Sequence, residues 1–415
     1  MIHAIRGTYD VLPAEIGIWH ALEARLRETF HAYGFGEIRT PIFESTELFV
    51  RGVGEETDIV SKEMYTFADR DETKSLTLRP EGTAAVIRAY IEHQLSNEAR
   101  MIKLYYLAPM FRRERPQKGR YRQHMQAGAE VLSSTDNPAI EAEVLEMLTG
   151  FLAHIGIPDL DVNINSVGDR ECRPAYVQLL REEIRKHADR LCEDCRRRGE
   201  KNSLRVFDCK APSCQPVIAE LPTITERLCE GCAGHFEKFK SYLSARNISF
   251  RVNSRLVRGL DYYTRTTFEI TSGRLGSQNT VAGGGRYDGL SEELDGPSTK
   301  GFGFGMGLER LILTIPDTAG LVPDYQPQYF IAPLGDAAFE RATLLAQKLR
   351  QAGKRVYLDF DARSLKSQMR LADKLAAKAV IIIGEEELKA GTLILRDMAT
   401  KGQRNIREEE FIANI

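Results

Sequence analysis

The sequence predicts an α+β fold with an antiparallel main sheet, followed by a smaller α/β domain. Two strand-like runs, Lys103 to Phe111 and Gln123 to Leu132, flank a short basic loop, as the strands of a hairpin do. A third run, Gly301 to Gly307, alternates glycine with bulky apolar residues, which gives a strand two different faces. Near the C-terminus, short buried-type strands alternate with helices, which is typical of an α/β unit.

Composition and charge narrow the class of protein. The 415 residues are enough for two or three domains. A net charge of −2 argues against indiscriminate binding to polyanions, so any contact with nucleic acid must come from a local basic surface. We find no apolar run of about 18 residues and no signal-peptide pattern, which predicts a cytoplasmic protein without a membrane partner. Seven cysteines, an odd number, favour thiols or metal ligands over a disulfide framework.

The chain divides into five segments. Strand patterns stop at Val167 and resume near Phe250, and the stretch between them is helical and strongly charged. We therefore predict a core in two parts, 1–169 and 248–317, interrupted by a helical insertion at 170–247. A proline-containing linker at 318–328 leads to a domain at 329–415.

The first part of the core begins with a helix and reaches a strand-to-helix corner. Apolar residues at helical spacing predict a helix over 14–33, which Gly34 ends. Near residue 80, Pro80 ends a strand and Thr83 is expected to cap the next helix. Glu81 is thereby held at the corner, where its carboxylate either binds an ammonium group or is simply exposed.

The loop of the predicted hairpin, 112–122, has five arginines and one lysine against one glutamate. The planar guanidinium group can bind phosphate oxygens in pairs, so the loop is a candidate phosphate-binding site. A basic loop can also be only a solvated tip. Gln126, Gly128 and Glu130 alternate along the returning strand, so one strand face presents polar groups beside the loop, which favours the binding site.

The segment from Leu256 to Ile270 combines a strand pattern with a polar turn. Arg258, Tyr262 and Tyr263 lie where this strand begins. They suit a small zwitterion, with the arginine on its carboxylate and a phenol on a ring nitrogen. The alternative is a surface turn in which Arg258 pairs with Asp261.

Glycines and cysteines supply two further motifs. In the run from Gly301 to Gly307, one face has only glycines, so a flat group such as a purine can lie against the backbone. The insertion contains two C-x-x-C pairs, which predict either a structural zinc ion or reduced thiols; the proposed ligands are Cys192, Cys195, Cys229 and Cys232.

The C-terminal domain has a basic helix. Its expected helix over 363–378 places Arg363, Lys366 and Arg370 on one face. Such a face is either solvated or a surface for nucleic acid.

Taken together, these motifs resemble the histidyl-tRNA synthetases, which are class II aminoacyl-tRNA synthetases. The resemblance covers nearly the whole chain. It rests on Arg6 to Asp10, a first class II motif ending at Pro41, a second at Phe111 to Pro116, a third at Gly301 to Arg310, and two histidine-specific motifs at Leu256 to Tyr263 and Gly283 to Asp288.

This resemblance implies the fold and the reaction. The fold would be a class II antiparallel sheet of six or more strands flanked by helices, with a helical insertion and a C-terminal α/β anticodon-binding domain. The activity would be that of a histidine–tRNA ligase, a homodimer that uses ATP with Mg²⁺ to join L-histidine to the 3′ end of tRNA(His) through histidyl-adenylate.

The resemblance also implies roles for individual residues. Arg258 and Arg112 would be catalytic. Histidine would be bound by Glu81, Gly82, Thr83, Gln126, Glu130, Arg258, Tyr262 and Tyr263. ATP would be bound by Arg112, Glu114, Arg120 and Arg310, and tRNA by the basic helix. A different class of relative, a regulatory subunit of ATP phosphoribosyltransferase, is the alternative, although such proteins lack the anticodon domain.

Overall fold

The structure is a computed structural model that describes residues 1–70, 74–117, 119–157, 159–273, 279–316, 325–361 and 363–414. The chain forms two compact units, 1–322 and 323–415. Most of the predicted linker, 318–328, lies outside the described residues. Among the helices in the described part of the chain, none is long and apolar enough to span a membrane.

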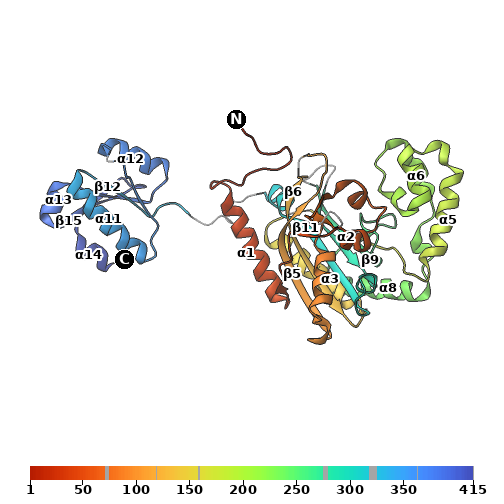
Figure 1. Cartoon of the computed structure of the whole chain (residues 1–415). Coiled ribbons are helices and arrows are strands. Elements are labelled where there is room, and N and C mark those ends of the chain that lie inside the picture. The colour runs from red at the N-terminus through yellow and green to blue at the C-terminus, as the bar shows by residue number, and fades with distance from the viewer. Residues whose placement is uncertain are drawn as a thin grey trace. The chain divides into compact units, whose positions relative to one another are not determined.

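The first unit is built around an eight-stranded sheet, which confirms the predicted α+β class (Figure 1). The six central strands pair antiparallel, and a short strand adds in parallel at each edge. In spatial order the strands are β1 (Gly36–Glu37), β5 (Met101–Phe111), β6 (Gln123–Ser133), β11 (Lys300–Gly307), β10 (Thr280–Arg286), β9 (Thr264–Ser272), β7 (Leu160–Ser166) and β8 (Arg251–Val252).

The predicted hairpin is β5 and β6, which pair without interruption from Met101 and Ser133 to Phe111 and Gln123. Strand β11 then pairs along the other side of β6, from Lys300 to Gly307. Because side chains alternate between the faces of a strand, this register sends all residues of one parity on β6 to the same face. The two faces of the sheet therefore present different sets of side chains, one to the hydrophobic core and one to the candidate site.

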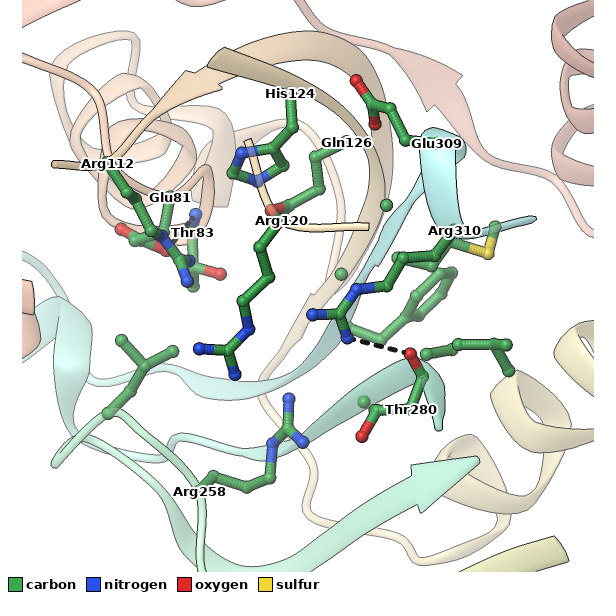
Figure 2. Close-up of a pocket in the computed structure, with 18 of the residues that line it drawn as sticks. Glu81, Thr83, Arg112, Arg120, His124, Gln126, Arg258, Thr280, Glu309 and Arg310 are labelled. Atoms are coloured by element: carbon green, nitrogen blue, oxygen red, sulfur yellow. Dashed lines mark hydrogen bonds between the residues drawn. The ribbon is translucent and has the colours of Figure 1, made fainter. Parts of the chain in front are cut away.

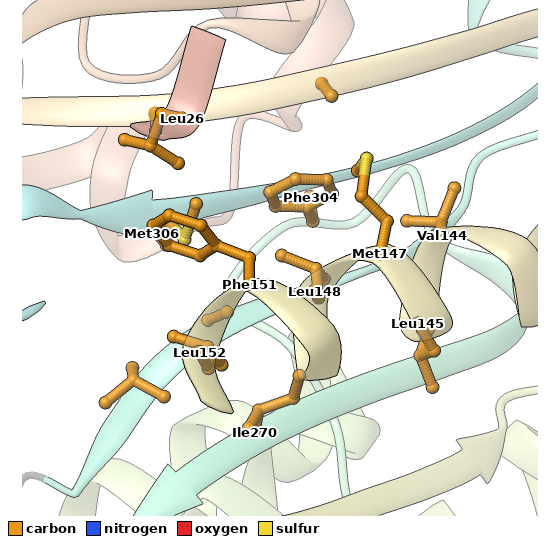
Figure 3. Close-up of a cluster of buried hydrophobic side chains, with 14 of the residues drawn as sticks. Leu26, Val144, Leu145, Met147, Leu148, Phe151, Leu152, Ile270, Phe304 and Met306 are labelled. Atoms are coloured by element: carbon orange, nitrogen blue, oxygen red, sulfur yellow. The ribbon is translucent and has the colours of Figure 1, made fainter. Parts of the chain in front are cut away.

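One face is the hydrophobic core. Phe304 and Met306 of β11 lie between Leu26 of α1 and Phe151 of α4, and each of the four is at most 3% exposed (Figure 3). Burying one such side chain contributes roughly 1.5–3 kcal/mol. The helices that supply this core are α1 (Ile16–Ala32), α4 (Ala139–His154), α8 (Glu230–Ala245) and α10 (Leu308–Thr314).

The opposite face is covered only in part. Tyr106 of β5 packs there with Val86 of α3, while Tyr287 packs with Ile87 and Leu290. The elements on this side are α2 (Thr46–Val53), the π-helical turn Ile59–Glu63, α3 (Thr83–Glu92), α9 (Leu290–Glu293) and a three-stranded sheet of β2 (Phe43–Ser45), β4 (Ser75–Leu78) and β3 (Tyr65–Ala68). The space that they leave over β6, β10 and β11 is the candidate site.

The insertion has a hydrophobic cluster of its own, which includes Tyr176, Leu180 and Val217. Its helices are α5 (Arg173–Lys186), α6 (Glu193–Lys201) and α7 (Gln215–Glu220), and α5 and α6 stand to one side of the sheet (Figure 1). Helix α8, which the predicted boundary at 247 puts in the insertion, instead adds Phe236 and Phe239 to the core under the sheet.

A buried cluster of ionisable side chains connects α8 and α4 to the sheet. Glu141 of α4 accepts hydrogen bonds from Arg286 of β10 and pairs with His235 of α8, both at 2.6 Å. The Arg286 and Glu141 side chains are 1% and 0% exposed. Burial alone raises the pKa of Glu141, but the nearby Arg286 and His235 outweigh it and lower that pKa. The ionised pair therefore holds the end of the Gly283–Asp288 motif in place.

The second unit is a five-stranded sheet with helices. Its strands are β13 (Val356–Leu358), β12 (Tyr329–Pro333), β14 (Ala379–Ile383), β15 (Thr392–Asp397) and β16 (Gln403–Arg407), in that order. Its helices are α11 (Asp336–Gln351), α12 (Leu365–Lys374), α13 (Glu385–Ala390) and α14 (Glu408–Ala413). The first three strands are parallel, as expected of an α/β unit, whereas the antiparallel β15 and β16 were not predicted.

Candidate active site

A pocket opens on the less covered face of the sheet, above β6, β10 and β11 (Figure 2). Its lining divides chemically into two halves. One half has an acid, an amide, a hydroxyl and phenols from β5, β6 and the segments at the starts of α3 and β9, and the other has arginines from the basic loop and α10. The predicted residues that line the pocket are Glu81, Thr83, Arg112, Glu114, Arg120, Gln126, Arg258, Tyr262, Tyr263 and Arg310.

Four arginines turn their guanidinium groups toward one space (Figure 2). Arg112 Nε donates to Pro80 O at 2.8 Å, and Arg310 donates to Gly119 O and Thr280 O, both at 3.0 Å. These bonds to backbone oxygens orient the cations without neutralising them. The pKa of Arg310 is lowered by burial and by the neighbouring positive charge of Arg120. The charges of Arg112, Arg120 and Arg310 gathered in this half of the pocket suit a polyanion such as a polyphosphate.

The other two arginines have carboxylate partners. Arg120 Nη1 donates to Glu114 Oε2 at 3.0 Å, and Arg258 Nη1 donates to Glu269 Oε1 at 2.9 Å. Arg258 therefore does not pair with Asp261, which instead accepts from Asn202 at 2.9 Å. The bond to Glu269 fixes one edge of the Arg258 guanidinium group beside the pocket.

His124 also lines the pocket, and the sequence analysis missed it. It precedes Gln126 by two residues on β6, so the alternation of the strand was the signal that could have found it. Burial and the positive charges of Arg112 and Arg310 lower the pKa of His124 to about 3. The imidazole is consequently neutral among the arginines.

Glu81 lies at the start of α3. Its carboxylate oxygens accept hydrogen bonds from the backbone N–H groups of Thr83 at 2.7 Å and Ala84 at 2.9 Å. The prediction that Thr83 caps this helix was therefore wrong, because Glu81 supplies the acceptor and the Thr83 hydroxyl donates to Glu130. Burial raises the pKa of Glu81. Each of its oxygens still has a lone pair with which to accept from a ligand.

Glu130 is fully buried and does not itself line the pocket. It accepts from the Thr83 hydroxyl at 2.8 Å and from the Tyr287 hydroxyl at 2.5 Å. Burial raises the pKa of Glu130 to about 8, although both hydroxyl groups act in the opposite direction. Tyr287 is a site residue that the sequence analysis did not name, although it belongs to the Gly283–Asp288 motif.

Phenol rings complete this half of the pocket. The rings of Tyr262 and Tyr263 lie 4.8 Å apart between centroids, and both residues line the pocket. Gln126 Nε2 donates to the Tyr106 hydroxyl at 2.9 Å. The predicted ligand contact Gly82 is not in the lining; a Cβ there would lie 2.2 Å from the Tyr106 ring. Gly82 therefore makes room for Tyr106.

The glycines of β11 face the pocket side, as predicted, but most of that face is covered. A Cβ at Gly301 would meet Tyr287 at 2.1 Å, and one at Gly303 would meet Glu130 at 1.8 Å. At Gly305 it would meet Gln126 at 2.5 Å, and only at Gly307 is nothing within 4 Å. The expectation of a bare strip is thus wrong for most of the strand, because site side chains occupy the room that the glycines leave.

The cysteines do not assemble as predicted. Cys192 and Cys195 lie with Cys209 and Cys214, whereas Cys229 and Cys232 lie with Asp169 and Cys172. The proposed set of Cys192, Cys195, Cys229 and Cys232 is therefore wrong as a single metal site. Each C-x-x-C pair finds its partners elsewhere in the chain.

The predicted nucleic-acid residues are on the surface of the second unit. Arg363, Lys366 and Arg370 are all exposed at or on α12, while Gln368 and Ala372 on the same helix are buried. The Arg363 guanidinium group pairs with Asp361, which reduces its availability to a phosphate.

Comparison with known proteins gives consistent matches. A family model described as histidyl-tRNA synthetase matches residues 7–171 and 213–311, and one described as an anticodon binding domain matches 328–415. A curated histidine–tRNA ligase of Solibacter usitatus is 51% identical, with 100% of this chain and 99% of the relative covered. The histidine–tRNA ligase of Koribacter versatilis is 48% identical, with 99% and 95% covered.

Solved structures agree. The crystal structure of apo histidyl-tRNA synthetase from S. aureus is 38% identical, with a TM-score of 0.83 over 100% of this chain and 99% of that one. A Bacillus halodurans structure described as an ATP phosphoribosyltransferase regulatory subunit/histidyl-tRNA synthetase is 20% identical with a TM-score of 0.66, and covers 92% of this chain and 98% of that one. The second likeness shows the fold alone.

Proposed function

Because this chain belongs to the histidyl-tRNA synthetase family, we propose that it joins L-histidine to the 3′ end of tRNA(His) through a histidyl-adenylate intermediate. One observation supports this most: a single pocket places a half rich in arginine beside a half with an acid, an amide and phenols. Such a pocket suits a reaction between an amino acid and ATP. The regulatory-subunit alternative is not favoured, since full-length ligases match at about half identity and an anticodon-binding domain is present.

The amino-acid half would hold histidine by its two ends. Glu81, Thr83 and Gln126 would accept from the α-ammonium group, and Arg258 would donate to the carboxylate. Each Glu130 oxygen accepts one hydrogen bond, from Thr83 or from Tyr287, and keeps a lone pair with which it would accept from the imidazole N–H.

Tyr263 would donate to the other ring nitrogen, with Tyr262 beside it. An amino acid without ring nitrogens would deprive Glu130 and Tyr263 of the buried partners that the imidazole would supply. Sites of this kind reject such analogues strongly, by a factor of roughly 10⁴–10⁵, because unpaired buried polar groups are costly.

ATP enters as its complex with Mg²⁺ and would occupy the arginine half. By motif position, Arg112 would bind the α-phosphate and Arg310 the γ-phosphate, with Glu114 and Arg120 beside them. The adenine would lie between the basic loop and the end of β11, where Gly307 leaves the backbone open.

The chemistry would proceed in two steps. The histidine carboxylate attacks the α-phosphorus and displaces pyrophosphate, and the 3′-hydroxyl of tRNA then attacks the acyl carbon and releases AMP. Negative charge grows on the α-phosphate oxygens in the first step. Arg112 and Arg258, fixed by their bonds to Pro80 and Glu269, would stabilise that charge at little cost of reorganisation.

We also propose that the enzyme is a cytoplasmic homodimer. Phe43 and Phe67 lie on the same face of the small three-stranded sheet, and both are about half exposed, at 53% and 45%. Ile42, the residue before Phe43, is 47% exposed. A patch of this kind favours an interface near the motif that ends at Pro41. Light scattering should give twice the chain mass of 46.8 kDa, and a single-chain mass would contradict the dimer.

The proposed cytoplasmic location is supported by the cysteines. The seven free thiols suit a reducing compartment.

The proposed reaction is tested by ATP–pyrophosphate exchange without tRNA, with each of the twenty amino acids in turn. We expect exchange with histidine alone, because only its side chain satisfies the buried acceptor and donor. Exchange with several amino acids, or no exchange in protein that binds ATP, would contradict the assignment of this pocket.

Replacing Arg258 tests the catalytic assignment. We expect Arg258→Ala to slow adenylate formation by a factor of about 10²–10³, the range found for loss of one donor to a developing oxyanion. Arg255→Ala is the matched control, since Arg255 donates to Ile218 O and Ala219 O rather than to the pocket. Pre-steady-state pyrophosphate release measures both, and a near-native rate in the first variant would refute the role.

The tRNA surface is tested separately from the pocket. We expect Arg363→Ala with Arg370→Ala to raise KM for tRNA and leave pyrophosphate exchange unchanged. Each lost phosphate contact should also reduce the slope of log affinity against log salt by about one. Lys389→Ala, on exposed α13 of the same unit, is the control. If the double variant matches that control, the α12 surface is merely solvated.

A further inference from the structure

All seven cysteines of the chain lie in two groups. The first group is Cys192, Cys195, Cys209 and Cys214, and the second is Asp169, Cys172, Cys229 and Cys232. Within each group the potential ligand atoms all lie within 4.8 Å of one another. Seven cysteines thus give one set of four thiols and one set of three thiols completed by a carboxylate. This arrangement accounts for the odd number.

The distances suit a shared ion and do not suit a disulfide. The Sγ atoms of Cys192 and Cys209 are 3.9 Å apart, as are those of Cys172 and Cys232. A disulfide needs about 2.0 Å. In a tetrahedron with zinc–sulfur bonds of about 2.3 Å, neighbouring sulfurs are roughly 3.8 Å apart. Both groups therefore have nearly the dimensions of a tetrahedral site.

Each group has a cysteine at a helix start, and the first group also has backbone N–H donors to sulfur. Cys192 and Cys229 precede α6 and α8 as N-caps with almost the same backbone, at φ −65°, ψ 162° and φ −65°, ψ 164°. In both pairs the second cysteine follows in the first helical turn. Backbone N–H groups point at two further sulfurs, from Cys192 to Cys214 Sγ at 3.2 Å and from Ala211 to Cys209 Sγ at 3.4 Å. Helix starts and N–H donors stabilise negative sulfur.

The carboxylate of the second group is fixed in place. Asp169 Oδ1 accepts from the Glu171 N–H at 3.0 Å, and Oδ2 accepts from Arg265 Nε at 3.3 Å. The same Oδ1 is 3.7 Å from Cys172 Sγ and 3.9 Å from Cys229 Sγ. One oxygen therefore faces the thiols while the other is held by the sheet, as in metal sites where a second group orients the ligand.

We propose that this chain binds two structural zinc ions, one through Cys192, Cys195, Cys209 and Cys214, and one through Asp169, Cys172, Cys229 and Cys232. Tetrahedral sets of thiolates with an occasional carboxylate are typical of zinc, and closed four-ligand sites are structural. Cys192 and Cys229 are only partly buried, which leaves a route for the metal to enter.

The two ions have different structural tasks. The first joins α6 to the turns before α7, and its four cysteines lie in or against the hydrophobic cluster of the insertion. The second joins the two ends of the insertion where they leave and re-enter the core. Arg265, which binds Asp169, is two residues from Tyr263, and Arg173 donates to Tyr263 O at 2.5 Å. The second ion thereby fixes the segment behind the amino-acid half of the pocket.

Metal analysis of the purified full-length protein tests this directly. Elemental mass spectrometry should find two zinc ions per chain. After exchange with Co²⁺, thiolate-to-cobalt charge-transfer bands should appear. Fewer than two equivalents of zinc after reconstitution with excess Zn²⁺ under reducing conditions would overturn the proposal. So would an intact mass that shows disulfides in protein kept reduced.

Single replacements separate the sites. Cys214→Ser and Asp169→Asn should each lower the content from two zinc ions to one, while Asp189→Asn, in the 3-10 turn between α5 and α6, should retain two. In the Cys214→Ser protein the remaining cobalt spectrum should be that of three thiolates. In the Asp169→Asn protein it should be that of four. Two ions retained in both Cys214→Ser and Asp169→Asn would refute the ligand sets, and this readout does not depend on enzyme activity.

Discussion

The candidate site depends on glycines at the centre of the sheet, where the backbone has no side chains. A Cβ at Gly128 would lie 2.2 Å from the Tyr106 hydroxyl, one at Gly283 would lie 2.5 Å from Arg258, and one at Gly303 would lie 1.8 Å from Glu130. The glycines of β6, β10 and β11 therefore let large polar side chains lie flat on the sheet. Because the other face of the same strands packs against α1 and α4, this floor is rigid, and the groups on it are held in position before any ligand binds (Figure 3).

The charged side chains on this face of the sheet form two groups, one at each end of the pocket. The basic loop and α10 bring Arg112, Arg120 and Arg310 to one end. His124 stays neutral there because burial and the charges of Arg112 and Arg310 lower its pKa to about 3. At the other end, burial raises the pKa of both Glu81 and Glu130, and hydroxyl or N–H donors satisfy them. Arg258 stands between the halves, held by Glu269. An amino-acid carboxylate bound there would face the phosphates, which is the geometry that adenylate formation needs.

Local patterns in the sequence predicted much of this arrangement. The β5–β6 hairpin and the two-faced strand β11 follow from period-two alternation, and most of the predicted ligand-binding residues line one pocket. The predictions that were wrong depended on contacts between residues far apart in the sequence. Whether Cys195 meets Cys214 or Cys232 depends on how the insertion turns back on itself, and its irregular 3-10 turns have no periodicity to read. Likewise β16 is a polar, exposed edge strand whose pattern does not distinguish it from a loop.

Histidine binding to a protein with Gly305→Ala, measured by calorimetry in the absence of ATP, is the most direct test of how the sheet positions the site. The added methyl group would lie 2.5 Å from Gln126 Nε2 and would push that side chain from the pocket, since the three atoms nearest to it all belong to Gln126. Gly150→Ala, on α4 with nothing within 4 Å, is the control. We expect histidine binding to weaken at least tenfold, which is about 1.4 kcal/mol, in a protein that melts like the control. Unchanged affinity would contradict the claim that the glycines of the sheet position the histidine-binding groups.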